Sequence, residues 1–142
     1  MNLTVDENTL DAEQFLTLRR SVGWKGNKEQ IEKSLKLGLY NVTVKYGGEA
    51  VGMGRLVGDG VMYWYIQDVV VLPAYQGRGV GKKIMECLLN HIEKSSADAT
   101  TVTIYLMAAK GKEAFYNKFG FITRPTEEYG AGMIKMQPIS RG

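Results

Sequence analysis

The segment Gln76–Gly81 carries the clearest chemical signal in the sequence, because glycine occupies every second position within it. Glycine permits positive φ angles and leaves no side chain between the main-chain amides and a ligand. The apolar run Ile66–Leu72 before this segment predicts a strand, and the apolar-periodic residues after it predict a helix. The amides of such a turn and the positive end of the helix dipole face one small volume, beside Arg78 and Lys82. This arrangement predicts an anion site, and a diphosphate is the expected ligand.

Two common phosphate loops do not match the spacing of these glycines. A Walker loop needs a glycine at position 76 and a Ser or Thr at position 83, which are Gln and Lys in this chain. The dinucleotide fingerprint GxGxxG needs a glycine at position 82, which is Lys. A turn that serves only the conformation of the chain stays open as the structural alternative.

The segment Gln76–Gly81 has the form Q/R-x-x-G-x-G/A and follows a strand that ends in Val-x-Pro. It resembles the acetyl-coenzyme A loop of the GCN5-related N-acetyltransferase (GNAT) family. A second segment, Ala114–Phe121, resembles the family's A-x-x-Y-x-K-x-G-F pattern with one spacer fewer. The resemblance covers the chain from about Val51 to Ile122. It departs from the family after the second splayed strand, where an Asn is common and Met107–Ala109 stand here.

The resemblance implies an α+β fold (mixed α/β), in which helices flank a central mixed sheet. Two parallel strands, Ile66–Leu72 and Thr101–Met107, would splay apart and admit acetyl-coenzyme A as co-substrate. The pantetheine arm would pair with the main chain of Val69, Val70 and Val71, and one amide near Val70 would polarise the thioester carbonyl. The implied contacts of the diphosphate are Gln76, Gly77, Arg78, Gly79, Val80, Gly81 and Lys82.

Tyr116 matches the family position that donates a hydrogen bond to the departing sulfur. A phenol of pKa about 10 is protonated at neutral pH, while a thiol has a pKa of about 8.5, so complete proton transfer would be uphill. Hydrogen-bond donation to the developing thiolate is therefore the expected role. The structural alternative is a core aromatic residue, like Phe115 and Phe119.

Asp68 is the candidate general base, because a carboxylate within an otherwise apolar strand needs a reason. An alkylamine has a pKa of about 10.4 and attacks only in its neutral form, so its proton must be removed. A carboxylate that pairs with Arg55 or caps a bulge explains Asp68 equally well. The candidates for the acceptor side are aromatic or cationic residues: Trp24, Tyr40, Arg55, Tyr63 and Tyr65.

Other reactive residue types have ordinary explanations. Cys87 lies within a predicted helix without a nearby His partner, so burial is expected rather than covalent catalysis. His91 lies near the end of that helix and is expected to be solvated. No Cys, His and carboxylate cluster has ligand spacing, so no metal is predicted.

Composition favours a single domain over residues 1–142, because 44% hydrophobic and 23% charged residues are typical of globular chains. A net charge of +3 is too small to indicate nucleic acid binding. One cysteine favours a reducing, cytoplasmic location. The N-terminus has no leader pattern and no apolar run matches a bilayer span, so no membrane partner is expected. The resemblance implies a possible homodimer.

Caps and turns predict the N-terminal elements that position these residues. Asp11 with Gln14 predicts a capping box, with a helix that ends near Gly23, and Asn27 predicts a second helix that ends at Gly38. Residues 40–46 and 51–57 read as a hairpin, in which Gly52 and Gly54 indicate a close approach by something large. A further hairpin turn leads into a strand over 61–72, with a bulge near Asp68.

The remaining elements alternate between helices and strands. Residues 81–95 read as a helix, and 101–107 as a buried strand parallel to the strand before that helix. A short helix over 112–119 ends at Gly120, and strands are expected from Phe121 and over Met133–Met136.

Taken together, the sequence predicts an N-acetyltransferase that moves an acetyl group to a primary amine of a small molecule or peptide. Direct attack in a ternary complex is the expected route. A non-catalytic acyl-coenzyme A sensor or interaction module is the alternative from another class, and release of free thiol discriminates between the two.

Overall fold

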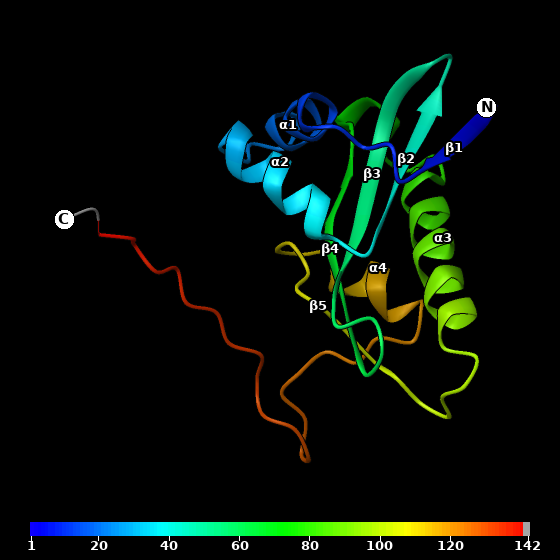
Figure 1. The fold of residues 1–142 in the computed structure, drawn as a ribbon. Helices are drawn as coiled ribbons and strands as arrows, with labels where there is room; N and C mark the ends of the chain where they lie inside the picture. The colour runs from blue at the N-terminus through cyan, green and yellow to red at the C-terminus, as the bar shows by residue number, and fades with distance from the viewer. Residues whose placement is uncertain (141–142) are drawn as a thin grey trace. The chain divides into compact units, whose positions relative to one another are not determined.

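The computed structural model describes residues 1–140, which divide into two compact units, Met1–Leu106 and the segment from Met107 onward. The first unit holds one five-stranded sheet and three α-helices, and the second holds one short helix (Figure 1). The single-domain expectation stays a prediction. The elements in chain order are β1 (Leu3–Glu7), α1 (Ala12–Ser21), α2 (Lys28–Leu37), β2 (Tyr40–Tyr46), β3 (Glu49–Gly58), β4 (Tyr63–Val71), the 3₁₀ turn η1 (Pro73–Tyr75), α3 (Val80–Ser95), β5 (Thr103–Leu106) and α4 (Glu113–Asn117).

The strand order is β1-β2-β3-β4-β5, so each strand pairs with its neighbour in sequence. The first four strands run antiparallel, and β5 runs parallel to β4 because α3 crosses between them. Helix α1 packs on β3 and β4, whereas α3 packs on β2, β3 and β4 from the opposite face (Figure 1). The predicted α+β class, with helices flanking a mixed sheet, is confirmed.

Both N-terminal helices begin where their caps predict. At α1, Gln14 N donates to Asp11 Oδ1 over 2.8 Å and Asp11 N donates to Gln14 Oε1 over 3.2 Å, which completes the capping box. Asn27 caps α2 through a single bond, in which Gln30 N donates to Asn27 Oδ1 over 3.0 Å, and Gly38 ends that helix. These caps fix where α1 and α2 lie along one face of the sheet.

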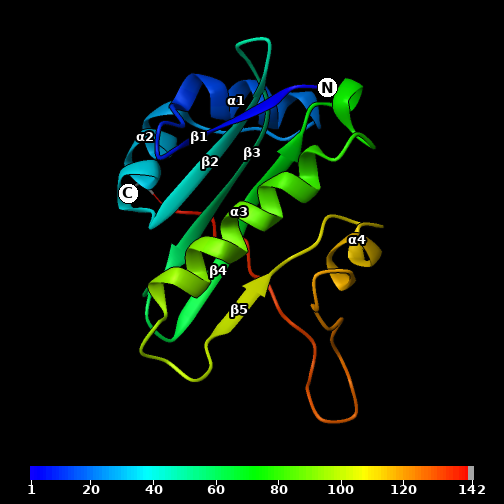
Figure 2. The same cartoon turned by 90° about the vertical axis from the view of Figure 1, so that its right-hand side faces the viewer.

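Helix α3 packs directly on Gly52 and Gly54 of β3. Figure 2 shows the face of the sheet that α3 covers. A Cβ atom built on Gly54 would lie 2.6 Å from Ile84 Cγ2 and 3.1 Å from Leu88 Cδ1. A Cβ atom built on Gly52 would lie 2.7 Å from Val80 Cγ1. The large neighbour that the glycines of this strand predict is therefore α3, and the contact with Val80 fixes where the helix begins.

His91 is half-buried rather than freely solvated as expected, because its ring packs against side chains of two strands. Its ring stacks on Tyr40 at 3.9 Å between centroids and meets Trp64 edge-on at 6.0 Å. Desolvation lowers the pKa of His91, which favours the neutral ring. Sequence periodicity did not indicate this position, since the partners come from two distant strands.

Several strand expectations need correction. The sequence did not indicate β1, a five-residue edge strand that pairs with β2. Strand β5 is four residues long, and none of them is fully buried. No strand forms at Phe121 or over Met133–Met136 within residues 107–140. An alternating or apolar run becomes a strand only where another strand pairs with it, and sequence pattern does not supply that partner.

Among residues 1–140, none of the helices combines the length and the apolar character that crossing a membrane requires.

The substitution Gly54→Ala tests the contact between β3 and α3. The added methyl group would overlap Ile84, so the free energy of unfolding should fall by about 1–3 kcal/mol. Gly132→Ala is the matched control, because a Cβ there meets no atom within 4 Å and the expected change is below about 0.5 kcal/mol. Urea unfolding measures both, and equal stability of Gly54→Ala and the wild type would contradict this packing.

Candidate functional site

Strand β4 extends beyond the end of β5, its parallel partner. Pairing with β5 runs from Tyr63 to Ile66, where β5 reaches its end at Leu106, yet β4 continues to Val71. Between these points, Asp68 has φ of +55°, and the register with β3 shifts between Met53 and Arg55. The predicted bulge is confirmed, and beyond it β4 pairs only with β3.

The second half of β4 directs some amides away from β3. Leu72 N donates to Val51 O over 2.9 Å, so the Leu72 amide points toward β3. Because N–H directions alternate along a strand, the Val70 amide also points toward β3, and those of Val69 and Val71 point to the opposite edge. These two outward amides, two residues apart on one edge of the strand, are the donors with which an extended ligand chain pairs.

The glycine segment forms an open turn at the start of α3. Gly77 has φ of +75° and Gly79 has φ of +85°, and a Cβ on either would meet no atom within 4 Å. Gly79 is the N-cap and has no side chain to accept from the helix, whose first bond runs from Lys83 N to Gly79 O over 3.1 Å. The amides of the preceding helical residues therefore have no intrahelical acceptor. This turn has the exposed amides and the dipole that bind a phosphate group.

Side chains around the turn add positive charge and order. Gln76 Nε2 donates to Val71 O over 3.1 Å, which ties the turn to the outward edge of β4. The Arg78 guanidinium lies over the Tyr75 ring at 5.7 Å. Lys82 Nζ lies 3.9 Å from Glu86 Oε1. This ion pair is exposed and therefore weak, so it would compete little with an anion at the turn. Val80 is buried as a whole residue, at 1% exposed, so its predicted contact with the diphosphate stays a prediction.

Asp68 lies between two arginines. Its Oδ1 accepts from Arg19 Nη1 and its Oδ2 accepts from Arg55 Nε, each over 2.9 Å, and the Asp68 side chain is 9% exposed. The ion pair with Arg55 at a bulge is the structural alternative that the sequence left open. Sequence reasoning missed Arg19, which lies 49 positions from Asp68 and carries no local signal beyond its place in the last turn of α1.

The candidate acceptor residues divide between the two faces of the sheet. Tyr63 and Tyr65 lie on the face opposite α3, where Tyr105 of β5 stacks beside them at 6.0 and 5.8 Å between centroids. Sequence reasoning missed Tyr105, although it alternates with Ile104 in the predicted strand. Tyr40 lies on the α3 face, buried against His91 with its hydroxyl bonded to Glu7. Its predicted place on the acceptor side stays a prediction, and the structure separates it from Tyr63 and Tyr65.

Trp24 lies near the arginine cluster on the α1 side. The Arg19 guanidinium packs over the Trp24 ring and over the Phe15 ring, at 5.4 Å from each centroid. Trp24, from a loop, therefore contacts a neighbour of Asp68, whereas Arg55, from β3, bonds to Asp68 directly. The structure brings these two candidates together and leaves Tyr40 apart from them.

Tyr116 belongs to the second unit, in α4. Its ring packs edge-on against Phe115 at 5.0 Å and Phe121 at 6.3 Å. Burial raises the pKa of Tyr116, so the phenol keeps its proton well above neutral pH. Gly120, at φ of +90°, follows α4 as predicted.

Burial also raises the pKa of the Cys87 thiol in α3, which disfavours the thiolate that a nucleophile needs.

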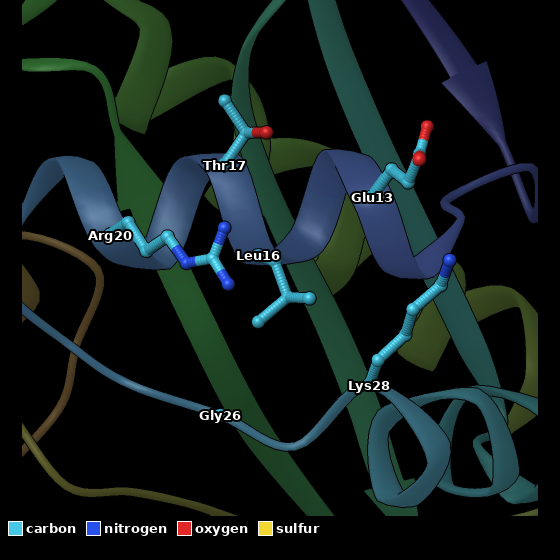
Figure 3. A pocket seen from close by; sticks show the side chains of 6 residues that line it. All are labelled: Glu13, Leu16, Thr17, Arg20, Gly26 and Lys28. Carbon is cyan, nitrogen blue, oxygen red and sulfur yellow. The ribbon is translucent and has the colours of Figure 1, made fainter.

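The larger of two hollows on the first unit, about 500 Å³, contains none of the predicted site residues. Figure 3 shows Leu16 pointing into it from α1, with Arg20 on the same helix and Lys28 at the start of α2. Glu13, Thr17 and Gly26 complete its lining. Its lining includes none of Arg19, Arg55 and Asp68.

Comparisons with known proteins agree with this geometry. The family model described as an acetyltransferase (GNAT) domain matches residues 9–140. An uncharacterized N-acetyltransferase from Prochlorococcus marinus is 32% identical over 123 residues, covering 82% of this chain and 66% of the relative. A relative from Porphyra purpurea is 31% identical over 110 residues, which cover 74% of this chain and 61% of that protein. The chain thus spans somewhat less than two thirds of these relatives' length.

Two solved structures share most of the fold. A probable acetyltransferase from meticillin-resistant Staphylococcus aureus superposes with a TM-score of 0.82 at 34% identity, over 95% of this chain and 100% of that one. A GNAT-family acetyltransferase from Streptococcus pneumoniae TIGR4 gives 0.80 at 29% identity, over 96% and 98%. The likeness extends over nearly the whole length of both chains.

Asp68→Asn tests the arginine cluster. Asn tolerates the positive φ at this position, so the substitution removes charge without adding backbone strain. It leaves Arg19 and Arg55 without a counter-charge, and the free energy of unfolding should fall by about 2–4 kcal/mol.

The matched control is Asp6→Asn, which removes the ion pair between Asp6 and Lys45. The Asp6 side chain is 41% exposed. The expected cost of Asp6→Asn is below about 1 kcal/mol. Chemical unfolding in low salt compares the two variants. Similar losses in both would show that the Asp68 cluster contributes no more than a surface pair.

Proposed function

The chain belongs to the acetyltransferase (GNAT) family, and on this premise we propose that it transfers an acetyl group from acetyl-coenzyme A to a primary amine. One observation carries the proposal: the outward amides of β4 lead directly into a glycine turn at an uncapped helix N-terminus. The acceptor is an amine of a small molecule or a peptide, and both substrates bind before reaction. A cytoplasmic location and a homodimer remain proposals.

The residues of the first unit fit the coenzyme. Val69 and Val71 offer outward amides that pair with the amide groups of the pantetheine arm, as an added strand does. The turn from Gln76 to Gly81 receives the diphosphate on main-chain amides, and open space at Gly77 and Gly79 lets the phosphates approach the backbone. Arg78 and Lys82 neutralise the phosphate charge.

The thioester supplies the activated acetyl group, and the residues of this chain orient and polarise it. An outward amide of β4 beside Val70 donates to the carbonyl oxygen, which gains negative charge as the amine attacks. The new C–N bond forms as the C–S bond breaks, and the amine loses one proton while the sulfur gains one. Tyr116 donates a hydrogen bond to that sulfur. Much of the acceleration comes from holding both reactants in one geometry.

Asp68 is better suited to a positioning role than to proton removal. Both of its oxygens already accept hydrogen bonds from the cationic side chains of Arg19 and Arg55. Protonation of the carboxylate would weaken these ion pairs, which hold the bulge. In that case the proton of the amine passes to solvent or to a group of the bound substrates. The pH profile of Asp68→Asn tests a base role. If the carboxylate accepts the proton, the loss of activity should be large near neutral pH and should shrink as pH approaches the pKa of the amine, about 10.4, where the amine is already neutral.

Release of free thiol from acetyl-coenzyme A, with a panel of amines, tests the proposed function. Tyr116→Phe should lower turnover by about a hundredfold, because the sulfur loses its hydrogen-bond donor. Affinity for coenzyme A, measured by calorimetry, should stay nearly unchanged. Tyr129→Phe is the control, since this exposed tyrosine belongs to the same unit and has no assigned role.

Two outcomes would contradict the assignment. Unchanged turnover in Tyr116→Phe would remove the tyrosine from the reaction. Coenzyme binding without acetyl transfer to any amine in a broad panel would favour the acyl-coenzyme A sensor instead.

A further inference from the structure

A second hollow lies beside the Asp68 cluster, between α1, α2 and β3, and its volume is about 240 Å³. This volume suits a small chemical group rather than a whole drug-sized ligand. Phe15, Ile31 and Leu35 form apolar walls, and the charged groups in the lining are the guanidinium groups of Arg19 and Arg55. The hollow therefore combines apolar walls with cationic groups.

The two arginines differ in how their donors are used. Each of the three Arg55 nitrogens donates one hydrogen bond: Nε to Asp68 over 2.9 Å, Nη2 to Ser34 Oγ over 2.9 Å, and Nη1 to Ser34 O over 3.4 Å. Arg19 bonds to Asp68 through Nη1, but its Nε is buried and has no hydrogen-bond partner among the described residues. A buried N–H without an acceptor costs free energy, and a ligand that accepts a hydrogen bond from Arg19 Nε would remove that cost.

Charge points to an anion of one unit. Arg19 and Arg55 together contribute two positive charges, and Asp68, which contacts both, contributes one negative charge. One positive charge is left over in a partly buried setting. A carboxylate balances it, whereas a phosphate dianion would overcompensate.

The Arg19 guanidinium is held in a fixed plane. The rings of Phe15 and Trp24 each lie 5.4 Å from its central carbon. The Nε–H and the adjacent Nη2–H form one edge of the guanidinium, and two parallel donors on such an edge match the two oxygens of a carboxylate. Packing against aromatic rings lowers the entropy that Arg19 loses on binding.

We propose that this hollow binds a carboxylate group of the acceptor through the Nε edge of Arg19, so that the acceptor is an amine that also carries a carboxylate. The role in acceptor selection rests on the proposed acetyl transfer. Asp68, which bonds to Arg19, directly precedes Val69, the first of the two residues of β4 whose amides point outward, so the hollow and the proposed thioester site are linked through Asp68. Amines with a carboxylate are therefore preferred over the same amines without one.

Titration of the full chain, labelled with ¹⁵N-arginine, tests carboxylate binding without acetyl-coenzyme A. The probes are N-acetyl amino acids and their carboxamides, which share every atom except the charged group. The Arg19 Nε–H resonance, identified by its absence in Arg19→Lys, should shift saturably with the acids and not with the amides. Arg19→Lys keeps the charge opposite Asp68 but loses the two-donor edge, and it should weaken binding about tenfold or more.

Arg20→Lys is the matched control, because Arg20 is the next residue of α1 and lines the other hollow. Its affinity for the acids should equal that of the wild type. Equal shifts with acids and amides, or equal affinity in Arg19→Lys and the wild type, would overturn the proposal. Tighter binding of inorganic phosphate than of any acid would also overturn it, by showing a general anion site. The wild-type comparison of acids with amides stands even if Arg19→Lys fails to fold.

Turnover separates this inference from the proposed function. The expected result is a kcat/KM about tenfold or more higher for amino acids than for their carboxamides. Equal values for both, with acetyl transfer intact, would overturn acceptor selection and leave the proposed function standing. Absence of any coenzyme binding would overturn the proposed function, and with it the acceptor role of the carboxylate site.

Discussion

The ion-paired bulge at Asp68 is the constraint on which the rest of the site depends. A residue with φ of +55° in the middle of a strand is unfavourable for most side chains, and Asp is among the few that tolerate it. Arg19 from α1 and Arg55 from β3 hold the carboxylate from two sides. The bulge shifts the register with β3 and turns the amides of Val69 and Val71 toward the edge that β5 has left.

The position of α3 depends on a second constraint, which is the absence of side chains on β3. Gly52 and Gly54 allow Val80, Ile84 and Leu88 to reach the backbone of the strand. The helix N-terminus is thereby held beside the end of β4, where Gly79 leaves the first amides uncapped. The strand edge and the helix terminus thus each offer main-chain donors. They are separated by η1, where Pro73 has no N–H and the amides of Tyr75 and Gln76 bond within the turn.

Sequence reasoning succeeded where the determining interaction is local. The helix caps at Asp11 and Asn27, the positive φ angles of Gly77 and Gly79, and the bulge at Asp68 are set within a few residues, so residue types indicate them directly. It failed where the partner lies far along the chain. The Arg19–Asp68 ion pair, the stack of Tyr40 on His91 and the edge strand β1 depend on contacts that no short pattern contains. The expected strands after Gly120 failed because apolar residues alone do not supply a pairing partner.

The central claim is that main-chain amides, more than side chains, bind the coenzyme. Amide ¹H–¹⁵N spectra recorded during a titration with coenzyme A test this most directly. The amides of Val69 and Val71 and those from Gly77 to Lys82 should shift together with one dissociation constant, while the amide of Val70, which points toward β3, should move least among the three valines. Saturable binding that leaves these amides unchanged, or no binding at millimolar coenzyme A, would contradict the account.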